Sequence, residues 1–387
     1  MTQPQAPQEV DLVVTGCEIV TLDRENRVIR DGAIAVSGNR IVWMGPREVA
    51  SAYKGKSVIN GNGRIALPGL IDAHFHTGQQ LLRGKLQDIA RRRPLKLPVW
   101  KNYLIPWESC LEPEDVYLSG LVAYANMIQV GTTCFAEAGG PHPDEMGRAA
   151  MDVGIRGFVS LSTVDQSETI GAEVPPNMLM THDEALARNV SLVKRWRDNE
   201  RVQAWLSLRQ VIVCSPELIR DIGAAARELD VKIHTHLCEG SYEIDYTLEK
   251  FGKRPTEWLD QMGVLSHHLH CAHSVLLSPA EVDLYHKHRL SACHCGLNNY
   301  SIGAPRLLEM LAAEALRAEF LRLVDAHVSN RDVIRDRRAE VREDFHRIAE
   351  LRREKQLEIS LHGFRDPDLR DRVAPRDTAR DRLIKSA

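Results

Sequence analysis

The sequence predicts an α/β fold, a TIM-like (β/α) barrel with a small β-sandwich part before it and a charged helical tail after it. Apolar runs alternate with amphipathic runs of helical period through residues 65–311, which is the pattern of a parallel sheet or an α/β barrel. Residues 1–64 instead consist of short strands divided by Gly and Asn-Gly turns. Residues 312–387 are strongly enriched in charged side chains, and we expect this tail to be mostly helical or partly disordered.

The first 64 residues predict the N-terminal strands of a small β-sandwich domain. Their β-branched and apolar runs end at turn residues, as half-buried strands do. The expected strands cover residues 12–14, 18–20, 33–36 and 40–43.

The barrel segment predicts seven clear strands separated by helices. These strands are expected at residues 65–72, 131–137, 155–162, 203–213, 231–237, 268–273 and 289–295. The clearest helices are expected at residues 114–130 and 216–229. A complete barrel needs an eighth strand. Because the composition changes abruptly where that strand should come, we expect the barrel to be incomplete.

Composition limits the classes of partner. The chain has 387 residues and a formal net charge of -3, so it has no broad basic surface for nucleic acid or an anionic membrane. Its start lacks a signal-peptide pattern, and no apolar stretch is long enough to span a bilayer. We therefore expect a cytoplasmic protein that acts on a small molecule. The eight cysteines, mostly in apolar segments, are expected to be reduced thiols.

The most informative motif is a pair of histidines, His74 and His76, at the end of the first barrel strand. Side chains two residues apart on a strand point the same way, which suits a shared metal ion. Barrel enzymes also place their chemistry at the C-terminal ends of strands. Taken alone, the pair is more often two ordinary histidines, so further ligands are needed.

A later strand again delivers histidine at its C-terminal end. His234 and His236 have the same strand parity, and spacing does not choose between them. Glu239 follows in the next loop, where it could act as a general acid over a metal held by His236. A core histidine and a solvated glutamate are the ordinary alternative.

Two more strands extend the series. The strand at 268–273 ends in His273, and the next carries Cys293, His294 and Cys295. Adjacent strand residues face opposite sides, so these last three cannot all reach one ion, and a cysteine-based site is disfavoured. Histidines at four successive strand ends are hard to explain as packing, because barrel interiors prefer Val, Ile and Leu. Three nitrogen ligands with an open position are typical of catalytic zinc.

Several stretches together resemble the amidohydrolase superfamily, in the family's order and approximate spacing over about residues 10–311. The similarity is greatest to the deaminases and chlorohydrolases of N-heterocyclic aromatic rings, which include methylthioadenosine/adenosylhomocysteine, guanine and cytosine deaminases and triazine hydrolases. The stretches are Leu67-Pro68-Gly69-Leu70-Ile71-Asp72-Ala73-His74-Phe75-His76, Leu81-Leu82-Arg83-Gly84, Gly131-Thr132-Thr133 and His236-Leu237-Cys238-Glu239.

The resemblance implies one divalent metal ion, zinc first and iron second, bound by His74, His76 and His236. It implies that Glu239 carries a proton to a ring nitrogen. His273 would orient or polarise the attacked carbon and the bound water.

The implied reaction is attack of metal-bound hydroxide on an amino-bearing carbon of a purine-like or related ring, followed by loss of ammonia. A chlorohydrolase or an amide hydrolase would use the same groups. Arg83 and Trp100 lie where the family shapes its substrate pocket, although a surface salt bridge and a core aromatic explain them equally well. The family is also often dimeric or larger, which makes a homo-oligomer one alternative and leaves the oligomeric state open.

One departure puts activity in doubt. The family's last barrel strand ends in a metal-binding aspartate, usually in Gly-Thr-Asp or Gly-Ser-Asp, and neither motif occurs here. Asp325 is the nearest substitute, but Leu316, Phe320 and Leu323 around it keep helical spacing, which favours helix.

The β-segment that usually completes the small domain is missing as well. A truncation or a frameshift would explain both losses, and a further interpretation is a non-catalytic protein whose charged tail mediates association. Reading the other frames of the locus tests the frameshift: we expect a Gly-Thr-Asp codon string, and its absence from every frame would count against the hypothesis.

Overall fold

The computed structural model describes residues 6–96, 98–166 and 174–295, which fall into two compact units. The first unit comprises the chain up to Ile71 together with Ile128–Cys134, and the second comprises Asp72–Met127 and the residues from Phe135 onward. The expected eighth strand, Asp325 and the tail at 312–387 lie outside the described residues.

The first unit contains a five-stranded sheet in the order β3-β2-β1-β4, with β5 paired to β1. β1 is antiparallel to β2 and parallel to β4. The expected strands at 12–14 and 18–20 form one long strand, because β1 continues through a bulge. A second layer, as in a sandwich, stays a prediction. The strands are β1 Gln8–Val20, β2 Val28–Ser37, β3 Arg40–Pro46, β4 Tyr53–Asn60 and β5 Ile65–Ala66.

The other described strands form two four-stranded sheets, in the orders β6-β7-β8-β9 and β10-β11-β12-β13, which belong to the second unit apart from the first residues of β6 and β7. Neighbouring strands run parallel throughout the second sheet. The strands are β6 Leu70–Phe75, β7 Thr132–Glu137, β8 Arg156–Val159, β9 Val202–Ala204, β10 Leu206–Gln210, β11 Ile233–Leu237, β12 Leu269–His273 and β13 Ser291–Cys293. All seven expected barrel strands therefore contain strand structure.

Two of the expected strands are interrupted. The run at 65–72 breaks into β5 and β6 around Pro68, which has no N–H to donate to a strand ladder. The run at 203–213 breaks at Trp205, whose N–H donates to Val159. The chain changes partner there, because β9 pairs with β8 whereas β10 pairs with β11.

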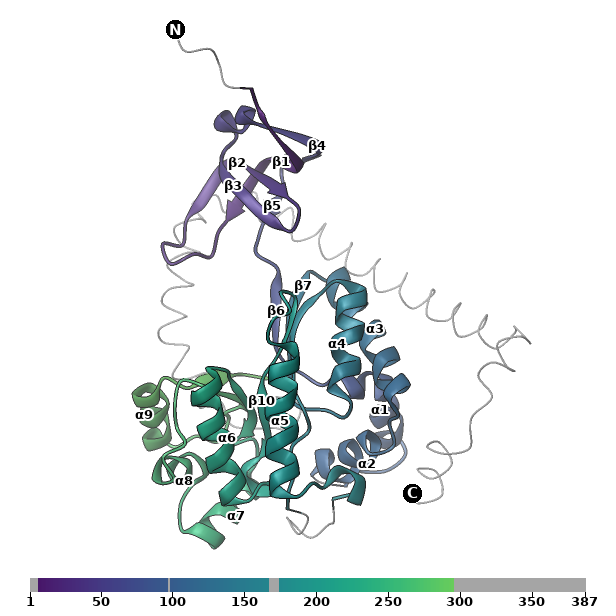
Figure 1. Ribbon diagram of the computed structural model, residues 1–387, viewed down its shortest axis with the longest axis vertical. Coiled ribbons are helices and arrows are strands. Elements are labelled where there is room, and N and C mark those ends of the chain that lie inside the picture. The colour runs from purple at the N-terminus through teal and green to yellow at the C-terminus, as the bar shows by residue number, and fades with distance from the viewer. Residues whose placement is uncertain (1–5, 97, 167–173, 296–387) are drawn as a thin grey trace, which may run out of the picture. The chain divides into compact units, whose positions relative to one another are not determined.

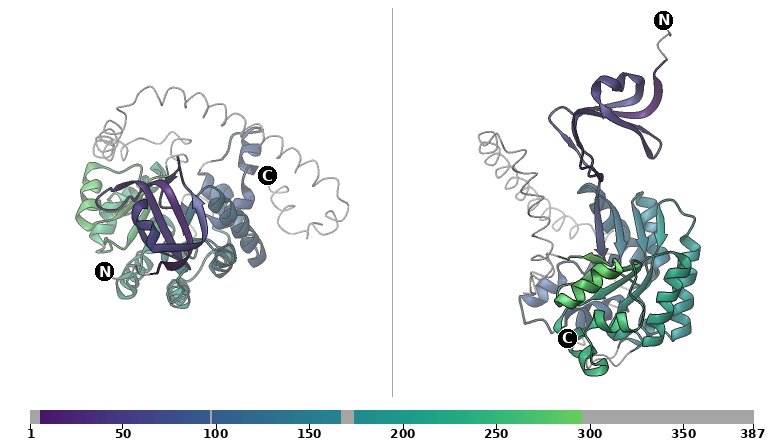
Figure 2. Two further views of the ribbon diagram at one scale, coloured as in Figure 1. Left: turned by 90° about the horizontal axis from the view of Figure 1, so that it is seen from above. Right: turned by 90° about the vertical axis from the view of Figure 1, so that its left-hand side faces the viewer.

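Along the chain, helices follow most of these strands. In space, α5 and α6 pack beside β10 (Figure 1). In the right-hand view of Figure 2, teal helices lie on the outer side of the strands. Three helices start at a hydroxyl that accepts a hydrogen bond from a backbone N–H of the first turn, namely Thr181, Ser215 and Ser278. The helices are α1 Lys85–Ala90, α2 Ile105–Glu108, α3 Pro113–Gln129, α4 Pro143–Val153, α5 His182–Trp196, α6 Pro216–Leu229, α7 Ser241–Phe251, α8 Pro255–Gln261 and α9 Pro279–His288.

The helices α3 and α6 begin within one residue of where the sequence predicts them. Within the described part of the chain, no helix combines the length and the apolar character that a membrane crossing requires.

A buried ion pair ties α2 to β10. Nη1 of Arg209 lies 2.5 Å from Oε2 of Glu108, and Nη2 lies 3.3 Å from Oε1, which is a two-point contact. Both residues are at most 3% exposed. Since charges so deeply buried need their partners, the pair fixes the end of β10, which carries the next residue, Gln210.

We expect Glu108→Ala to destabilise the chain by about 3–5 kcal/mol, because it leaves a buried guanidinium without its carboxylate. Glu217→Ala is the matched control, since Glu217 pairs with Arg220 on the exposed surface, where an ion pair contributes little. Urea unfolding followed by circular dichroism measures both variants. Equal loss of stability would contradict the importance of the buried pair.

Candidate metal centre

Three histidines from two separate strands meet in the second unit. His74 lies in β6 and His76 follows that strand, and their ring centroids are 5.0 Å apart. His236 lies in β11, and its Nε2 is 3.2 Å from Nε2 of His76. One ligand atom from each of the three lies within 4.8 Å of the others. The fold thus gathers the trio that the sequence resemblance implies.

This geometry fits a shared cation. Two histidine nitrogens bound to one tetrahedral zinc ion at 2.0–2.1 Å stand about 3.3 Å apart. The separation of 3.2 Å between His76 and His236 is close to that value. Nδ1 of His236 lies 2.7 Å from the backbone carbonyl oxygen of Arg209, which can only accept. His236 therefore carries its proton on Nδ1, and Nε2 keeps a lone pair for a metal.

The electrostatics favour the ligand form of these rings. Burial lowers the pKa of His74, His76 and His236 well below the usual histidine value, and neighbouring histidines lower it further. A positive charge on any of these buried rings would lose its hydration, and charges on two neighbouring rings would repel each other. The rings are consequently neutral near pH 7, which is the state that binds metals.

His234, which spacing did not separate from His236, plays a different part. Its Nε2 is 3.0 Å from Nδ1 of His74, so it contacts the side of that ring away from Nε2. The His234 and His270 rings are 4.9 Å apart, and Nε2 of His270 donates to the carbonyl oxygen of Ala73. His234 therefore contacts the Nδ1 side of the His74 ring, and His270 packs against His234; we call these two the inner histidines.

Glu239 lies beside the cluster and is held by neutral donors. Its Oε2 accepts hydrogen bonds from Nε2 of Gln210 and from the hydroxyl of Tyr242, both at 2.8 Å. Its Oε1 lies 3.7 Å from Nε2 of His273. One carboxyl oxygen is thus anchored while the other faces His273, which suits a group that transfers protons.

Trp100 joins the same network. Its Nε1–H donates to the hydroxyl of Tyr242 at 2.9 Å, so it supports the residue that holds Glu239. Arg83 does not join: it is exposed at the end of the 3-10 helix Thr77–Leu82, and its guanidinium forms no hydrogen bond or ion pair with the described residues. A substrate-binding role for either residue stays a prediction.

The strands β11 and β12 end in strained backbone. Cys238 after β11 has φ 52°, and His273 and Ser274 at the end of β12 have φ 67° and 49°. Non-glycine residues seldom adopt positive φ, and such strain concentrates at functional sites. The amide of Ser274 donates to the carbonyl of Leu237, which ties the two strained ends together.

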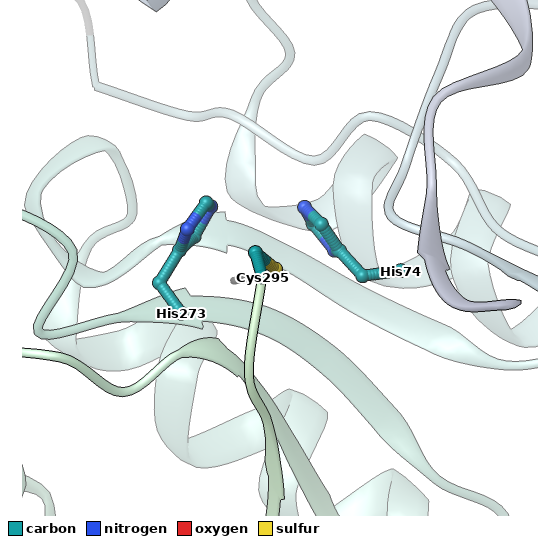
Figure 3. A group of neighbouring side chains, drawn as sticks. All are labelled: His74, His273 and Cys295. Carbon is teal, nitrogen blue, oxygen red and sulfur yellow. The ribbon is translucent and has the colours of Figure 1, made fainter. Parts of the chain in front are cut away.

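Cys295 also approaches the histidines. One ligand atom each from His74, His273 and Cys295 lies within 4.8 Å of the others, and the two rings flank the thiol in Figure 3. The Cys295 thiol donates a hydrogen bond to the backbone carbonyl oxygen of Cys293 at 3.7 Å. The neighbouring thiol of Cys293 and the ring of His273 lower the pKa of the Cys295 thiol. His294 is exposed. As strand alternation predicts, the Cys-His-Cys run does not converge as a whole, but one thiol reaches the site.

A third group with metal-binding side chains lies elsewhere on the second unit. It consists of Asp230, His267 and His268, of which only His268 is buried. His268 Nε2 already lies 3.1 Å from a carboxylate oxygen of Asp230. This group has no proton-transfer residue like Glu239 among the contacts described for it.

Sequence reasoning missed Gln210 and Tyr242. Gln210 is the last residue of β10, and histidines lie at or next to the ends of neighbouring strands. Its place at a strand end could have marked it as a site residue. Tyr242 reaches Glu239 only through the turn into α7, which no motif marks.

A model of the amidohydrolase family matches residues 65–338 of the chain. The chain belongs to the amidohydrolase family. It is similar to the 5-methylthioadenosine/S-adenosylhomocysteine deaminase of Moorella thermoacetica, with 27% identity over 307 residues that cover 78% of this chain and 67% of the relative. The corresponding deaminase of Nitratidesulfovibrio vulgaris is 30% identical over 320 residues, which cover 81% and 67%. The chain spans about two thirds of the length of these curated relatives.

Solved structures agree on the fold. An adenosine deaminase from Xanthomonas campestris with bound zinc has a TM-score of 0.67 and 27% identity, over 77% of this chain and 65% of that one. A guanine deaminase from C. acetobutylicum with bound guanine has a TM-score of 0.65 and 22% identity, over 76% and 69%. These likenesses confirm an α/β fold of the TIM-barrel type.

Removing one ligand should empty the centre. We expect the zinc-loaded protein to hold about one ion per chain and His236→Ala to lose it, because two imidazoles alone bind zinc weakly. His294→Ala is the control, since this nearby histidine is exposed, and it should keep its zinc. Mass spectrometric metal analysis after gel filtration gives the stoichiometry. Equal zinc content in both variants would mean that the ligands are wrongly assigned.

Proposed function

We propose that this chain is a metal-dependent hydrolase that removes an amino group from an N-heterocyclic aromatic ring, with purine amines the first candidates. The observation that supports this most is the meeting of three neutral imidazoles from β6 and β11 beside a carboxylate, Glu239. The proposal also draws on the named relatives, which are deaminases of purine nucleosides.

The histidines His74, His76 and His236 would hold the ion, for which zinc is the first choice and iron the second. When bound, such an ion supplies the positive charge that makes water nucleophilic near neutral pH. The donor set of imidazole nitrogens suits either metal.

Glu239 would move the protons of the reaction. In the amine hydrolysis, water adds to the ring carbon, a ring nitrogen gains a proton, and ammonia leaves after gaining another. Because Oε2 of Glu239 is anchored by Gln210 and Tyr242, Oε1 is the oxygen available to carry each proton. His273, 3.7 Å from that oxygen, would donate a hydrogen bond to the oxygen that adds to the ring.

The leaving group separates deamination from its alternatives. A chlorohydrolase or an amide hydrolase would use the same proton carrier but release chloride or a substituted amine. A non-catalytic protein would release none of them.

A panel of aminated rings tests the proposal directly. We expect the zinc-loaded protein to release ammonia from at least one of the purine nucleosides, guanine, pterins, aminopyrimidines and aminotriazines in the panel. Ammonia is measured with a coupled assay, and chloride and amine release are measured in parallel on chlorinated and amide analogues. A protein with a full complement of zinc that hydrolyses none of these compounds would overturn the proposal.

The role of Glu239 has its own test on whichever ring is hydrolysed. Glu239→Gln keeps the shape of the side chain but not its proton transfer, so we expect kcat to fall by about 100- to 10,000-fold. Zinc content should not change, because Glu239 is not one of the three ligands. Glu249→Gln, on the exposed face of α7, should keep normal kcat. A Glu239→Gln variant with normal turnover would exclude this residue as the proton carrier.

A further inference from the structure

We propose that His74, His273 and Cys295 form a mixed nitrogen and thiolate metal site that binds zinc. Their ligand atoms lie within 4.8 Å of one another, as do those of the all-histidine trio. In Figure 3 the two imidazoles stand on either side of the Cys295 side chain, so a cation between them would contact sulfur as well as nitrogen.

The three residues come from three separate parts of the second unit. His74 belongs to β6, His273 ends β12, and Cys295 lies two residues beyond β13. Because Cys295 follows the end of its strand, strand alternation does not dictate where its thiol points. The argument from alternation against a cysteine ligand therefore applies to His294 but not to Cys295.

His74 is oriented to serve this site. Its Nδ1 lies against Nε2 of His234 at 3.0 Å, which leaves Nε2 to face the other members of the cluster. Its ring centroid is 5.1 Å from that of His273 and 4.9 Å from that of His236. His74 therefore stands between the two trios and is common to both.

Sharing one residue has a chemical consequence. A single nitrogen binds one ion at a time, so the two trios cannot each hold an ion through Nε2 of His74. Either one ion takes ligands from both trios, or the ion is exchanged between them. In both cases the zinc acquires a sulfur ligand.

The thiolate would also change which metal is preferred. Sulfur ligands favour zinc and copper(I), whereas an all-imidazole site suits zinc, iron and nickel alike. Among the two metals considered for this chain, Cys295 thus favours zinc. This site does not depend on the proposed deamination, because zinc can bind to it whether or not a heterocycle is hydrolysed.

X-ray absorption at the zinc edge tests the site without any assay of activity. In the zinc-loaded full chain we expect one sulfur scatterer at about 2.3 Å besides nitrogen scatterers at 2.0–2.1 Å. Cys295→Ser should remove the sulfur scatterer. Cys110→Ser is the matched control and should keep it, because Cys110 is also a half-buried free cysteine but belongs to none of the described groups of metal-binding side chains.

A fourth sample separates this proposal from the all-histidine centre. His76→Ala removes a ligand from the all-histidine trio only. Like His236→Ala it should hold less zinc than the wild type, and the zinc that it still holds should show the sulfur scatterer, because His74, His273 and Cys295 are intact. Cys295→Ala, checked by circular dichroism, serves if the serine variant does not fold. A wild-type spectrum with nitrogen scatterers alone would overturn the proposal, as would a sulfur signal that survives Cys295→Ser.

Discussion

The site depends on a cluster of imidazoles that are kept neutral by burial. His74, His76, His234 and His236 are packed so closely that a proton on any of them would meet both desolvation and its neighbours' repulsion. A buried ring nitrogen without a partner costs free energy, and Nδ1 of His76 and Nδ1 of His234 are buried with no hydrogen-bond partner among the described residues. The carbonyl oxygen of Arg209 pairs with Nδ1 of His236, and Nε2 of His234 lies against Nδ1 of His74. Nε2 of His76 and Nε2 of His236 lie 3.2 Å apart.

Residues next to this cluster fix the positions of His236 and Glu239. The ion pair between Glu108 and Arg209 fixes the end of β10. There the backbone carbonyl of Arg209 accepts a hydrogen bond from His236, and the side-chain amide of Gln210 donates one to Glu239. One buried ion pair thus positions both a proposed metal ligand and the proposed proton carrier. A substitution of Glu108 would therefore shift His236 and Glu239 through β10, although Glu108 is not itself part of the cluster.

The sequence alone predicted much of this arrangement, and its successes share a cause. Local periodicity places His74, His76 and the pair His234 and His236 at strand ends, because a strand's end and its side-chain parity are visible in a few neighbouring residues. The choice of His236 over His234 came from the resemblance to the amidohydrolases. The contacts of Gln210, Tyr242 and Cys295 were not predictable, since they depend on how separate strands are paired and where each one stops. The break at Trp205 was missed for the same reason: the residues favour one strand, but the pairing partners divide it.

Anomalous diffraction from a crystal soaked in zinc tests the central claim most directly. The account predicts a zinc peak within about 2.0–2.3 Å of ligand atoms of the cluster around His74, in contact with His76 and His236 or with His273 and Cys295. A zinc peak found only at the surface group of Asp230, His267 and His268 would contradict it, as would a fully soaked crystal with no zinc bound to the cluster.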